Sequence, residues 1–314
     1  MTPRLVLGTM TFADTVDETT ARGMLDTALD HGVTEIDTAN AYVGGATEEM
    51  LGRLLDGRRD RVTLASKAGM PHPDAGPDGP LSATALRASL EGSLRRLGTD
   101  HLDLYYLHQP DRRTPLEETL GTIAEFVAEG KVRELGVSNY AAWQIADVER
   151  VAAAVGAPKP VVAQQLYNLV ARRVEEEYVE FAAVHHLDTM VYNPLGGGLL
   201  TGRHHFDAPP ADGRFGDSKL AAMYTQRYWN EQLFTALEAM GALAAEAGLS
   251  LVEVAFRWVA YRPGVAAVLL GGSRESQVSG NIETVRKGPL PADLVARLDA
   301  VGEGLRGPSP AYNR

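Results

Sequence analysis

The sequence predicts one closed (β/α)8 barrel of the TIM type. Short runs rich in β-forming residues alternate with segments of helical periodicity along the 314 residues. Such alternation implies parallel strands, because a parallel return needs a crossover of a dozen or more residues. Eight parallel units can close into a barrel. The expected strands are residues 5–7, 34–37, 61–66, 102–107, 132–137, 161–165, 188–192 and 265–269.

Helical segments lie between these runs. Leucines recur at helical spacing through residues 83–97, where Ser82 is a suitable N-terminal cap and Gly98 a suitable end. The helix expected after the fourth strand begins near Pro115, with acidic residues in its first turn. Each expected strand is thus followed by a helix.

An open doubly wound sheet is the rival architecture. Such a sheet normally carries a Gly-x-Gly-x-x-Gly turn after its first strand, and the residues after 5–7 do not supply it. We therefore expect a single-domain barrel over residues 1–314. The alternation of strand and helix patterns is interrupted at about 196–226, which predicts a long loop after the seventh strand. It ends in a tail over 305–314.

Composition excludes several classes of protein. The chain has no cysteine, so disulfides and thiolate chemistry are absent. Its net charge of −11 opposes general attraction to nucleic acid or anionic membranes. No apolar run approaches the ~18 residues of a membrane helix, and from the first residues we expect no signal peptide. We expect a cytoplasmic protein with a small-molecule partner.

Four titratable residues follow successive expected strands. Asp37, Lys67 and His108 stand at the ends of the second, third and fourth strands, and Tyr42 follows Asp37 closely. Catalytic residues of such barrels come from these strand ends. Each residue alone would more often be a cap, packing or a satisfied core group, but the four together in order favour a catalytic site.

The chemistry of this set can be predicted. Asp37 should keep a buried Lys67 protonated, since an isolated buried charge is costly. The Lys67 cation should lower the pKa of Tyr42 toward the working range of a general acid. A neutral His108 can bind and orient a carbonyl oxygen. The set is suited to protonating an oxygen while the adjoining carbon is attacked.

Several motifs resemble the aldo-keto reductases. They are ExDTAxxY over residues 35–42, Ser66-Lys67, YYLHQPD over 105–111, GVSN over 136–139 and QxxYN over 164–168. The resemblance implies a barrel that binds NADP(H) in extended form without a Rossmann domain. It also implies that Tyr42 is the proton donor, that Lys67 and Asp37 tune it, and that His108 orients the carbonyl.

Further motifs resemble one subfamily most closely, the aflatoxin aldehyde and succinic semialdehyde reductases. These motifs lie at residues 192–203, 213–215, 227–230 and in the ending PSPAYNR, a tail that the similar potassium-channel beta subunits do not share. The resemblance implies a homodimer. Relatives often have a small polar residue at the position of Arg274, where an arginine suits a 2′-phosphate.

The expected cofactor contacts follow from this resemblance and from the residue types. The Tyr192 ring can cover the nicotinamide, flexible glycines allow close approach to the pyrophosphate, and a helix start near Arg274 favours a phosphate. The full set is Gly8, Thr9, Met10, Asp37, Ser138, Asn139, Gln164, Tyr192, Asn193, Pro194, Leu195, Gly197, Arg203, Arg214, Gly271, Ser273, Arg274, Gln277 and Asn281.

The substrate is expected to be a short aldehyde with a carboxylate, or a dicarbonyl. Arg227 and Arg314 are the candidate guanidinium partners of a carboxylate, and Trp229 and Met10 the candidate apolar walls. Tyr42 and His108 would face the carbonyl group.

Three other readings stay open. A barrel lysine such as Lys67 can form a Schiff base in an aldolase. A cofactor-binding sensor or channel-associated subunit would keep the same site but turn over slowly. A metal hydrolase could use the pairs His185-His186 and His204-His205, although neighbouring side chains on one element point apart.

Overall fold

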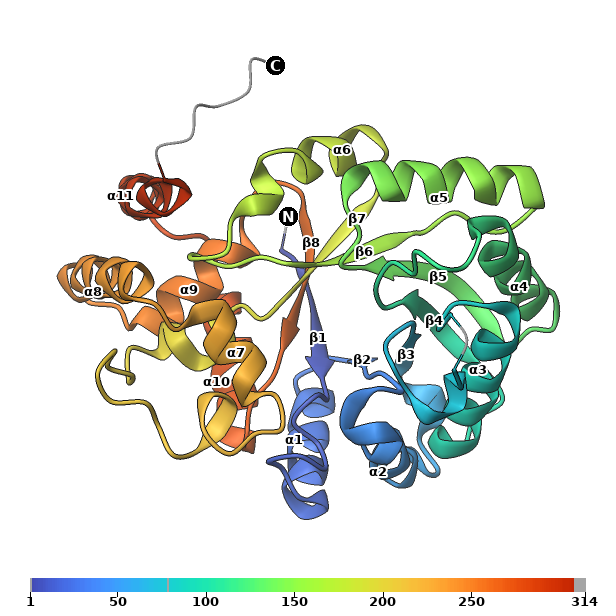
Figure 1. Cartoon of the computed structure of the whole chain (residues 1–314). Helices are drawn as coiled ribbons and strands as arrows, with labels where there is room; N and C mark the ends of the chain where they lie inside the picture. Colours follow the sequence, from blue (N-terminus) through green and yellow to red (C-terminus); the bar gives the residue numbers. More distant parts are fainter. Residues whose placement is uncertain (1, 78, 308–314) are drawn as a thin grey trace.

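The computed structural model describes residues 2–77 and 79–307. Its centre is a closed barrel in which each strand pairs in parallel with the next, and β8 returns to β1 (Figure 1). The strands are β1 (Arg4–Gly8), β2 (Glu35–Asp37), β3 (Thr63–Ala68), β4 (Leu102–Leu107), β5 (Val132–Ser138), β6 (Val162–Leu166), β7 (Asp188–Tyr192) and β8 (Val265–Leu270). The predicted closed barrel and its eight strands are confirmed.

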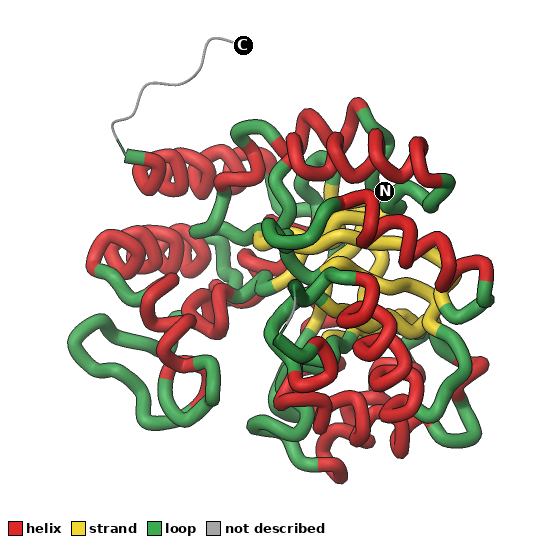
Figure 2. The backbone as a smooth tube through the Cα atoms, turned by 45° about the vertical axis from the view of Figure 1, so that its right-hand side comes forward, coloured by secondary structure: helices red, strands yellow, loops and turns green. Residues whose placement is uncertain are grey.

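Helices form a layer around the strands (Figure 2). They are α1 (Glu18–Asp30), α2 (Ala46–Leu55), α3 (Ala83–Leu97), α4 (Leu116–Ala128), α5 (Ala142–Val155), α6 (Tyr178–Val184), α7 (Ala221–Tyr228), α8 (Glu231–Glu246), α9 (Leu251–Ala260), α10 (Glu275–Arg286) and α11 (Ala292–Glu303). The predicted punctuation of α3 is confirmed. The Ser82 hydroxyl accepts a hydrogen bond from the Ala85 amide, and Gly98 ends the helix in the left-handed region.

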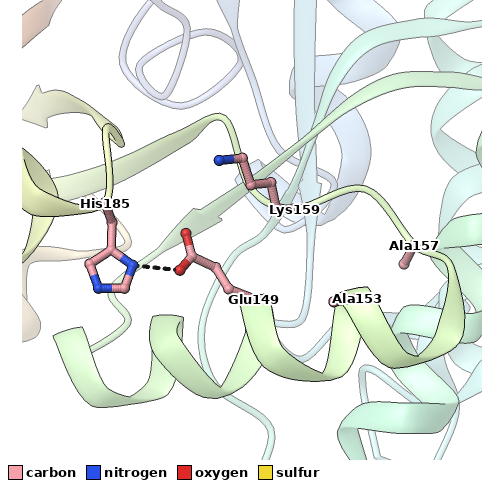
Figure 3. A pocket seen from close by; sticks show the side chains of 5 residues that line it. All are labelled: Glu149, Ala153, Ala157, Lys159 and His185. Carbon is pink, nitrogen blue, oxygen red and sulfur yellow. Dashed lines mark hydrogen bonds and ion pairs between the residues drawn. The ribbon is translucent and has the colours of Figure 1, made fainter.

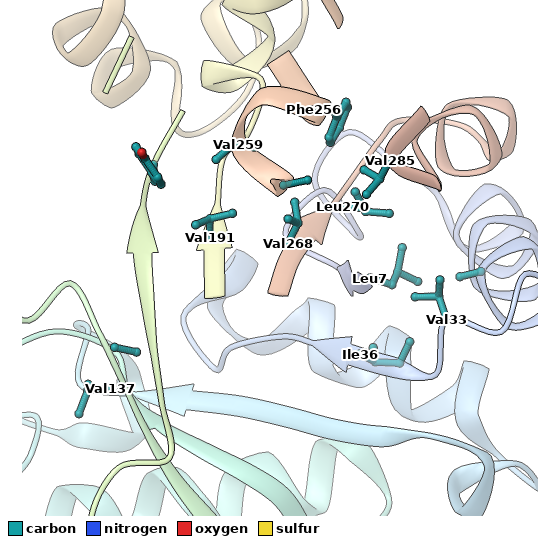
Figure 4. Close-up of a cluster of buried hydrophobic side chains, with 14 of the residues drawn as sticks. Leu7, Val33, Ile36, Val137, Val191, Phe256, Val259, Val268, Leu270 and Val285 are labelled. Atoms are coloured by element: carbon teal, nitrogen blue, oxygen red, sulfur yellow. The ribbon is translucent and has the colours of Figure 1, made fainter. Parts of the chain in front are cut away.

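Alternation along the strands separates two apolar layers. Inside the barrel, Val6, Ala267 and Leu269 pack with Tyr106 and Met190. The intervening residues point outward into the larger layer beneath the helices, which Figure 4 shows around Leu7, Ile36, Val137, Val191, Val268 and Leu270. The period of two in a strand therefore decides which side chains can reach the barrel axis.

The segment after β7 is more structured than the long loop expected over residues 196–226. It contains the 3-10 turns η5 (Gly196–Thr201) and η6 (Gly213–Phe215), and α7 begins at Ala221. Tyr224 and Tyr228 lie one turn apart on α7, and both are buried. Burial of two aromatic rings on one face stabilises a helix that local composition does not predict.

Within the described residues, no single helix has both the length and the hydropathy of a membrane span. Only α8 and α9 taken together meet both criteria, and the two helices are bent by 95° relative to each other.

Candidate active site

The four predicted catalytic side chains converge at the carboxyl end of the barrel. Asp37 is the last residue of β2, Lys67 lies near the end of β3, and His108 directly follows β4. Tyr42 begins the 3-10 turn η1 (Tyr42–Gly45). Lys67 is fully buried and points into the barrel, because Ala65, two residues earlier on the same strand, also faces inward.

The Lys67 ammonium uses three partners. It forms an ion pair with Asp37 Oδ1, donates to the Thr38 carbonyl at 2.8 Å, and lies 3.2 Å from the Tyr42 hydroxyl. The other Asp37 oxygen accepts a hydrogen bond from Gln164 Nε2 at 2.9 Å. The carboxylate is therefore held from two sides, and the ammonium is directed at the phenol.

Burial and charge act in opposite directions on the pKa of Lys67. Burial lowers this pKa, but the Asp37 charge and the hydrogen bonds to Asp37 and Tyr42 outweigh burial, so the net pKa is raised. Lys67 is therefore protonated at neutral pH, as predicted. A protonated amine is a poor nucleophile, which argues against the Schiff-base reading.

The prediction for Tyr42 is wrong in its net direction. Burial raises the pKa of the Tyr42 phenol, and the Lys67 charge lowers it by less, so the net pKa lies above its ordinary value. Sequence reasoning counted the cation and omitted the loss of solvation. Tyr42 therefore stays protonated at neutral pH, which is the form that a proton donor requires.

His108 is buried beside Tyr42. The two rings meet edge to face with their centroids 6.0 Å apart. Burial, and then the charge of Lys67, hold the pKa of His108 well below its ordinary value, so the imidazole is neutral as expected. Its Nδ1 has no hydrogen-bond partner among the described residues.

The turn that presents Tyr42 has unusual backbone geometry. Val43 has φ 49° and ψ 35°, and Gly44 and Gly45 have φ values of 63° and 98°. A β-branched residue rarely adopts the left-handed region, and such strain persists only where surrounding contacts fix the conformation. The position of Tyr42 therefore depends on contacts outside its own turn.

Polar residues of β5, β6 and β7 line one side of the mouth. Asn139 has φ 62° and donates to the His108 carbonyl at 2.9 Å. Its Oδ1 accepts from the Tyr192 hydroxyl at 2.7 Å. The Ser138 hydroxyl donates to the Gln164 carbonyl at 3.0 Å. Asn139 is exposed to solvent, and the amide nitrogen of Gln164 donates to Asp37 and contacts the Met190 sulfur, so amide groups suited to a carboxamide are present at the mouth.

The end of β1 lies on the opposite side of Asp37. Both the amide and the hydroxyl of Thr9 donate to the Asp37 carbonyl, at 3.0 and 2.9 Å. Gly8 leaves room for Leu269, whose nearest side-chain atom would be 3.3 Å from an added Cβ. The sulfur of Met10 lies 3.8 Å from Arg214 Nη1.

The segment after β7 reaches the same mouth. The Asn193 side chain, on a residue with φ 62°, accepts from the Gly197 amide at 2.6 Å. Pro194 is buried and Leu195 half-buried at this point. Gly197 has φ 72°, and an added Cβ would lie 2.4 Å from the Tyr224 ring. Only glycine fits at this position.

Two cations of this segment differ in their surroundings. Arg203 is exposed and approaches Gly198 and Gly213, with its Nη2 3.9 and 3.4 Å from where a Cβ would stand. Arg214 is half-buried and donates to the Tyr224 hydroxyl at 2.6 Å. Both guanidinium groups flank a glycine-rich backbone, which suits a pyrophosphate.

The predicted phosphate site after β8 lies at the start of α10. Arg274 is the N-terminal cap residue, is exposed, and makes no side-chain capping bond. The Ser273 amide and hydroxyl both donate to Gln277 Oε1, and Asn281 donates to the Gly271 carbonyl at 3.1 Å. The four predicted side chains and Gly271 therefore gather around one helix start.

The predicted substrate residues are placed less uniformly. Arg227 is exposed on α7 and lies close to Tyr192. Burial raises the pKa of the Tyr192 phenol to about 12, and the charge of Arg227 opposes part of this rise. Trp229 packs against Phe215 and Phe234, and its indole N–H donates to the Phe206 carbonyl at 3.0 Å. Arg314 lies outside the described residues.

Comparison with known proteins agrees with this geometry. The family model described as "Aldo/keto reductase family" matches residues 4–303. The chain belongs to the aldo/keto reductase family.

This aldo/keto reductase is similar to named proteins over nearly its whole length. It is 35% identical to human aldo-keto reductase family 7 member A3, with 99% of this chain and 97% of that protein covered. It is 35% identical to human aflatoxin B1 aldehyde reductase member 2, with 98% and 89% covered. It is also 32% identical to a probable voltage-gated potassium channel subunit beta of Arabidopsis thaliana, with 95% and 90% covered. Family and relatives together make the chain an oxidoreductase.

Sequence reasoning on this aldo/keto reductase missed three residues near the site. The Tyr224 hydroxyl accepts a hydrogen bond from Arg214, and the Tyr228 hydroxyl accepts one from Asn193 at 3.0 Å. Their spacing of four residues within 221–228 was a helical signal that could have been used. Glu48, buried in the first turn of α2, is the third, and an acid at a helix start gives no sign of its burial.

The histidine pairs form no metal site in the described part of this aldo/keto reductase, where no three potential ligands cluster. His204 packs on Phe215 and Trp229. His185 binds Glu149 at 2.6 Å in a pocket with Lys159 (Figure 3). The residues that line this pocket precede β6 and β7 in the chain, so the pocket lies at the amino end of the barrel, opposite to the mouth.

Proposed function

We propose that this aldo/keto reductase reduces aldehydes and ketones to alcohols with NADPH, and that Tyr42 is the proton donor. The observation that carries the proposal is the Lys67 ammonium, which binds Asp37 and lies 3.2 Å from the Tyr42 hydroxyl. A phenol in hydrogen-bond contact with a fixed cation can release its proton in a transition state without first becoming a stable anion.

The residues of the chain divide the work on the carbonyl group. Neutral His108 donates to the carbonyl oxygen and orients it toward the Tyr42 hydroxyl. As the proton leaves Tyr42, the Lys67 charge stabilises the phenolate that develops. Asp37 balances the Lys67 charge throughout, so the buried site never carries an unpaired ammonium. Bound NADP(H) supplies the hydride for the carbonyl carbon.

Structural features of the mouth fit such a dinucleotide. Gln164 and the exposed Asn139 suit a carboxamide. The left-handed glycines of η5, with Arg203 and Arg214, suit a pyrophosphate. Gly8, Thr9 and Met10 on one side, and Asn193, Pro194 and Leu195 on the other, would border the nicotinamide half.

The preference for NADPH over NADH rests on Arg274. Its exposed guanidinium at the start of α10 suits the 2′-phosphate, together with Ser273, Gln277 and Asn281. Arg274→Ala should raise the Kd for NADPH and leave the Kd for NADH unchanged, as measured by quenching of protein fluorescence. Equal affinities of the parent for both cofactors would refute this preference.

For the substrate we propose a short aldehyde with a carboxylate, or a dicarbonyl. Arg227 supports this choice because it is the exposed cation beside Tyr192 at the mouth. Arg227→Ala should raise the KM for succinic semialdehyde and leave the KM for butanal unchanged. The contributions of Trp229 and Arg314, the homodimer and the cytoplasmic location stay predictions.

One experiment tests the reaction class. NADPH and NADH absorbance is followed with a panel of charged and uncharged aldehydes, ketones and dicarbonyls. Rapid loss of NADPH absorbance with aldehydes supports the enzyme. Tight cofactor binding with almost no turnover on the whole panel would favour a cofactor-binding sensor, a reading that the similarity to a potassium channel subunit keeps relevant. Borohydride trapping of substrate on Lys67 would favour the aldolase.

A further inference from the structure

A buried ion pair lies behind the active site, between the barrel and its helices. Glu48 of α2 is fully buried and accepts from Arg96 Nε of α3 at 2.8 Å. Its other oxygen accepts from the Ser66 hydroxyl at 2.5 Å. A buried ion pair is weak evidence for stability, because desolvation can exceed the Coulombic gain. Its position therefore calls for another explanation.

The pair joins the two elements that carry Lys67 and Tyr42. Ser66 directly precedes Lys67 on β3 and points to the opposite face of the strand. Glu48 lies in the first turn of α2, directly after the η1 turn that begins with Tyr42. One carboxylate thus connects the strand of the ammonium to the helix that follows the phenol.

Arg96 supports the strained turn itself. A Cβ on Gly45, the last residue of η1, would lie 2.9 Å from both Cδ and Nε of Arg96. The guanidinium therefore packs directly against the backbone that keeps Val43 in the left-handed region. Arg96 Nη1 also donates to Asp74 Oδ2 at 2.8 Å, which anchors it from the loop after β3. The turn cannot relax toward α3 while this side chain is in place.

We propose that Glu48 and Arg96 are positioning residues, which hold the η1 turn and the tip of β3 at the separation that keeps the Tyr42 hydroxyl against the Lys67 ammonium. The proposal rests on the proposed function for its effect on catalysis. Its geometric part, the distance between phenol and ammonium, can be tested separately.

The first test uses Glu48→Gln, which keeps the side-chain shape and removes the charge. We expect kcat to fall about 10–100-fold, because a displacement of about 1 Å in a reacting group has effects of this size. The KM for aldehyde and the Kd for NADPH should stay unchanged, since neither ligand touches Glu48. Arg96→Lys, which keeps the charge but not the planar fork that contacts Glu48 and Asp74 together, should also lower kcat in a folded protein.

A matched control separates positioning from general stability. Asp103 binds Arg59 at 2.8 Å and accepts from the Leu64 amide, so this pair supports the other end of β3. Asp103→Asn should lower the free energy of unfolding as Glu48→Gln does, and leave kcat and its pH dependence unchanged. Where Glu48→Gln does not fold, Ser66→Ala removes one contact of the same carboxylate and should lower kcat in a folded protein.

A second readout does not depend on turnover. NMR of protein labelled at the hydroxyl-bearing carbon of tyrosine follows the titration of Tyr42, with Tyr42→Phe to assign the signal. Lys67, Asp37, His108 and Tyr224 surround this phenol. Because Lys67 lowers the pKa of Tyr42, Glu48→Gln should raise it. An unchanged titration, with kcat falling only by the unfolded fraction, would overturn the proposal. A parent without aldehyde reduction would refute the proposed function alone.

Discussion

At the scale of single residues, Tyr42 combines two opposing influences. Burial raises the pKa of its phenol, and the ammonium of Lys67 partly offsets the rise. The ground state is therefore the neutral acid, and the cation is used when the proton leaves. This division explains why the lysine must be buried with its own carboxylate rather than left in solvent.

Tyr42→Phe tests this assignment. Removing the hydroxyl should lower kcat about 10²–10⁴-fold, the usual contribution of a positioned general acid. Cofactor affinity should not change, because the ring remains in place. Steady-state rates with NADPH and an aldehyde, combined with a fluorescence titration of NADPH, measure both quantities. A variant as active as the parent would show that another group donates the proton.

His108 makes stability depend on pH. Its pKa is well below the ordinary value, because of burial and then the charge of Lys67, so the unfolded chain binds a proton more readily than the folded chain. The free energy of unfolding is therefore unaffected by the titration of His108 above about pH 6.5. It falls as pH drops below that value, by up to about 1.4 kcal/mol per pH unit.

His108→Gln should therefore weaken the loss of stability in acid. Urea unfolding at neutral pH and in mild acid measures the difference for parent and variant. The pKa of His204 is also lowered, by burial and by Arg203. Because both proteins keep His204, its effect on the acid dependence is the same in both and cancels in the comparison. An equally steep acid dependence in the variant would contradict the assignment of a neutral buried imidazole.

At the scale of elements, close helix packing beside the site depends on glycine. A Cβ on Gly52 of α2 would lie 2.3 Å from the Arg96 carbonyl of α3, whereas nothing lies within 4 Å of one on Gly121 of α4. Gly52→Ala should destabilise the protein by about 1–3 kcal/mol. Gly121→Ala should stabilise it by about 0.5–1 kcal/mol through helix propensity. Chemical denaturation of both variants tests the contrast, and equal effects would refute it.

The elements also show how far sequence reasoning reaches. The strands, and the positions of the four titratable side chains at strand ends, were predictable because a period of two, a following helix and a titratable residue at a strand end are local signals. The left-handed conformation of Val43 was not predictable, since a β-branched residue disfavours it and the Arg96 side chain that packs on the same turn is distant in sequence. The net pKa of Tyr42 was not either, because burial arises from residues distant in sequence.

At the scale of the whole molecule, a network of acidic residues and arginines connects α11 to the segment after β6. Glu175 accepts from Arg172, Arg262 and Arg306, and from the Tyr167 hydroxyl at 2.5 Å. Two of these arginines also lie over the Trp258 ring. Asp299 of α11 binds Arg262 at 2.8 Å, so the network reaches the C-terminal helix.

Glu175→Gln should weaken the attachment of α11, which Asp299 would still hold through Arg172 and Arg262. Three guanidinium groups would lose their shared partner, and we expect a loss of about 2 kcal/mol in unfolding free energy, the scale of hydrogen bonds to charged groups. Cleavage by protease near α11 should also accelerate. Glu246→Gln is the control, because it breaks an exposed pair with Arg297 of the same helix and should change little. Equal effects of the two variants would exclude a special role for Glu175.

The pairing of β1 with both β2 and β8 has a consequence for biosynthesis. On the ribosome, one side of β1 has no hydrogen-bonding neighbour until β8 has emerged. A nascent chain in that interval presents an open sheet edge that other chains can join. The barrel can close only after β8 has been made, so β1 must be kept from pairing with other chains until then.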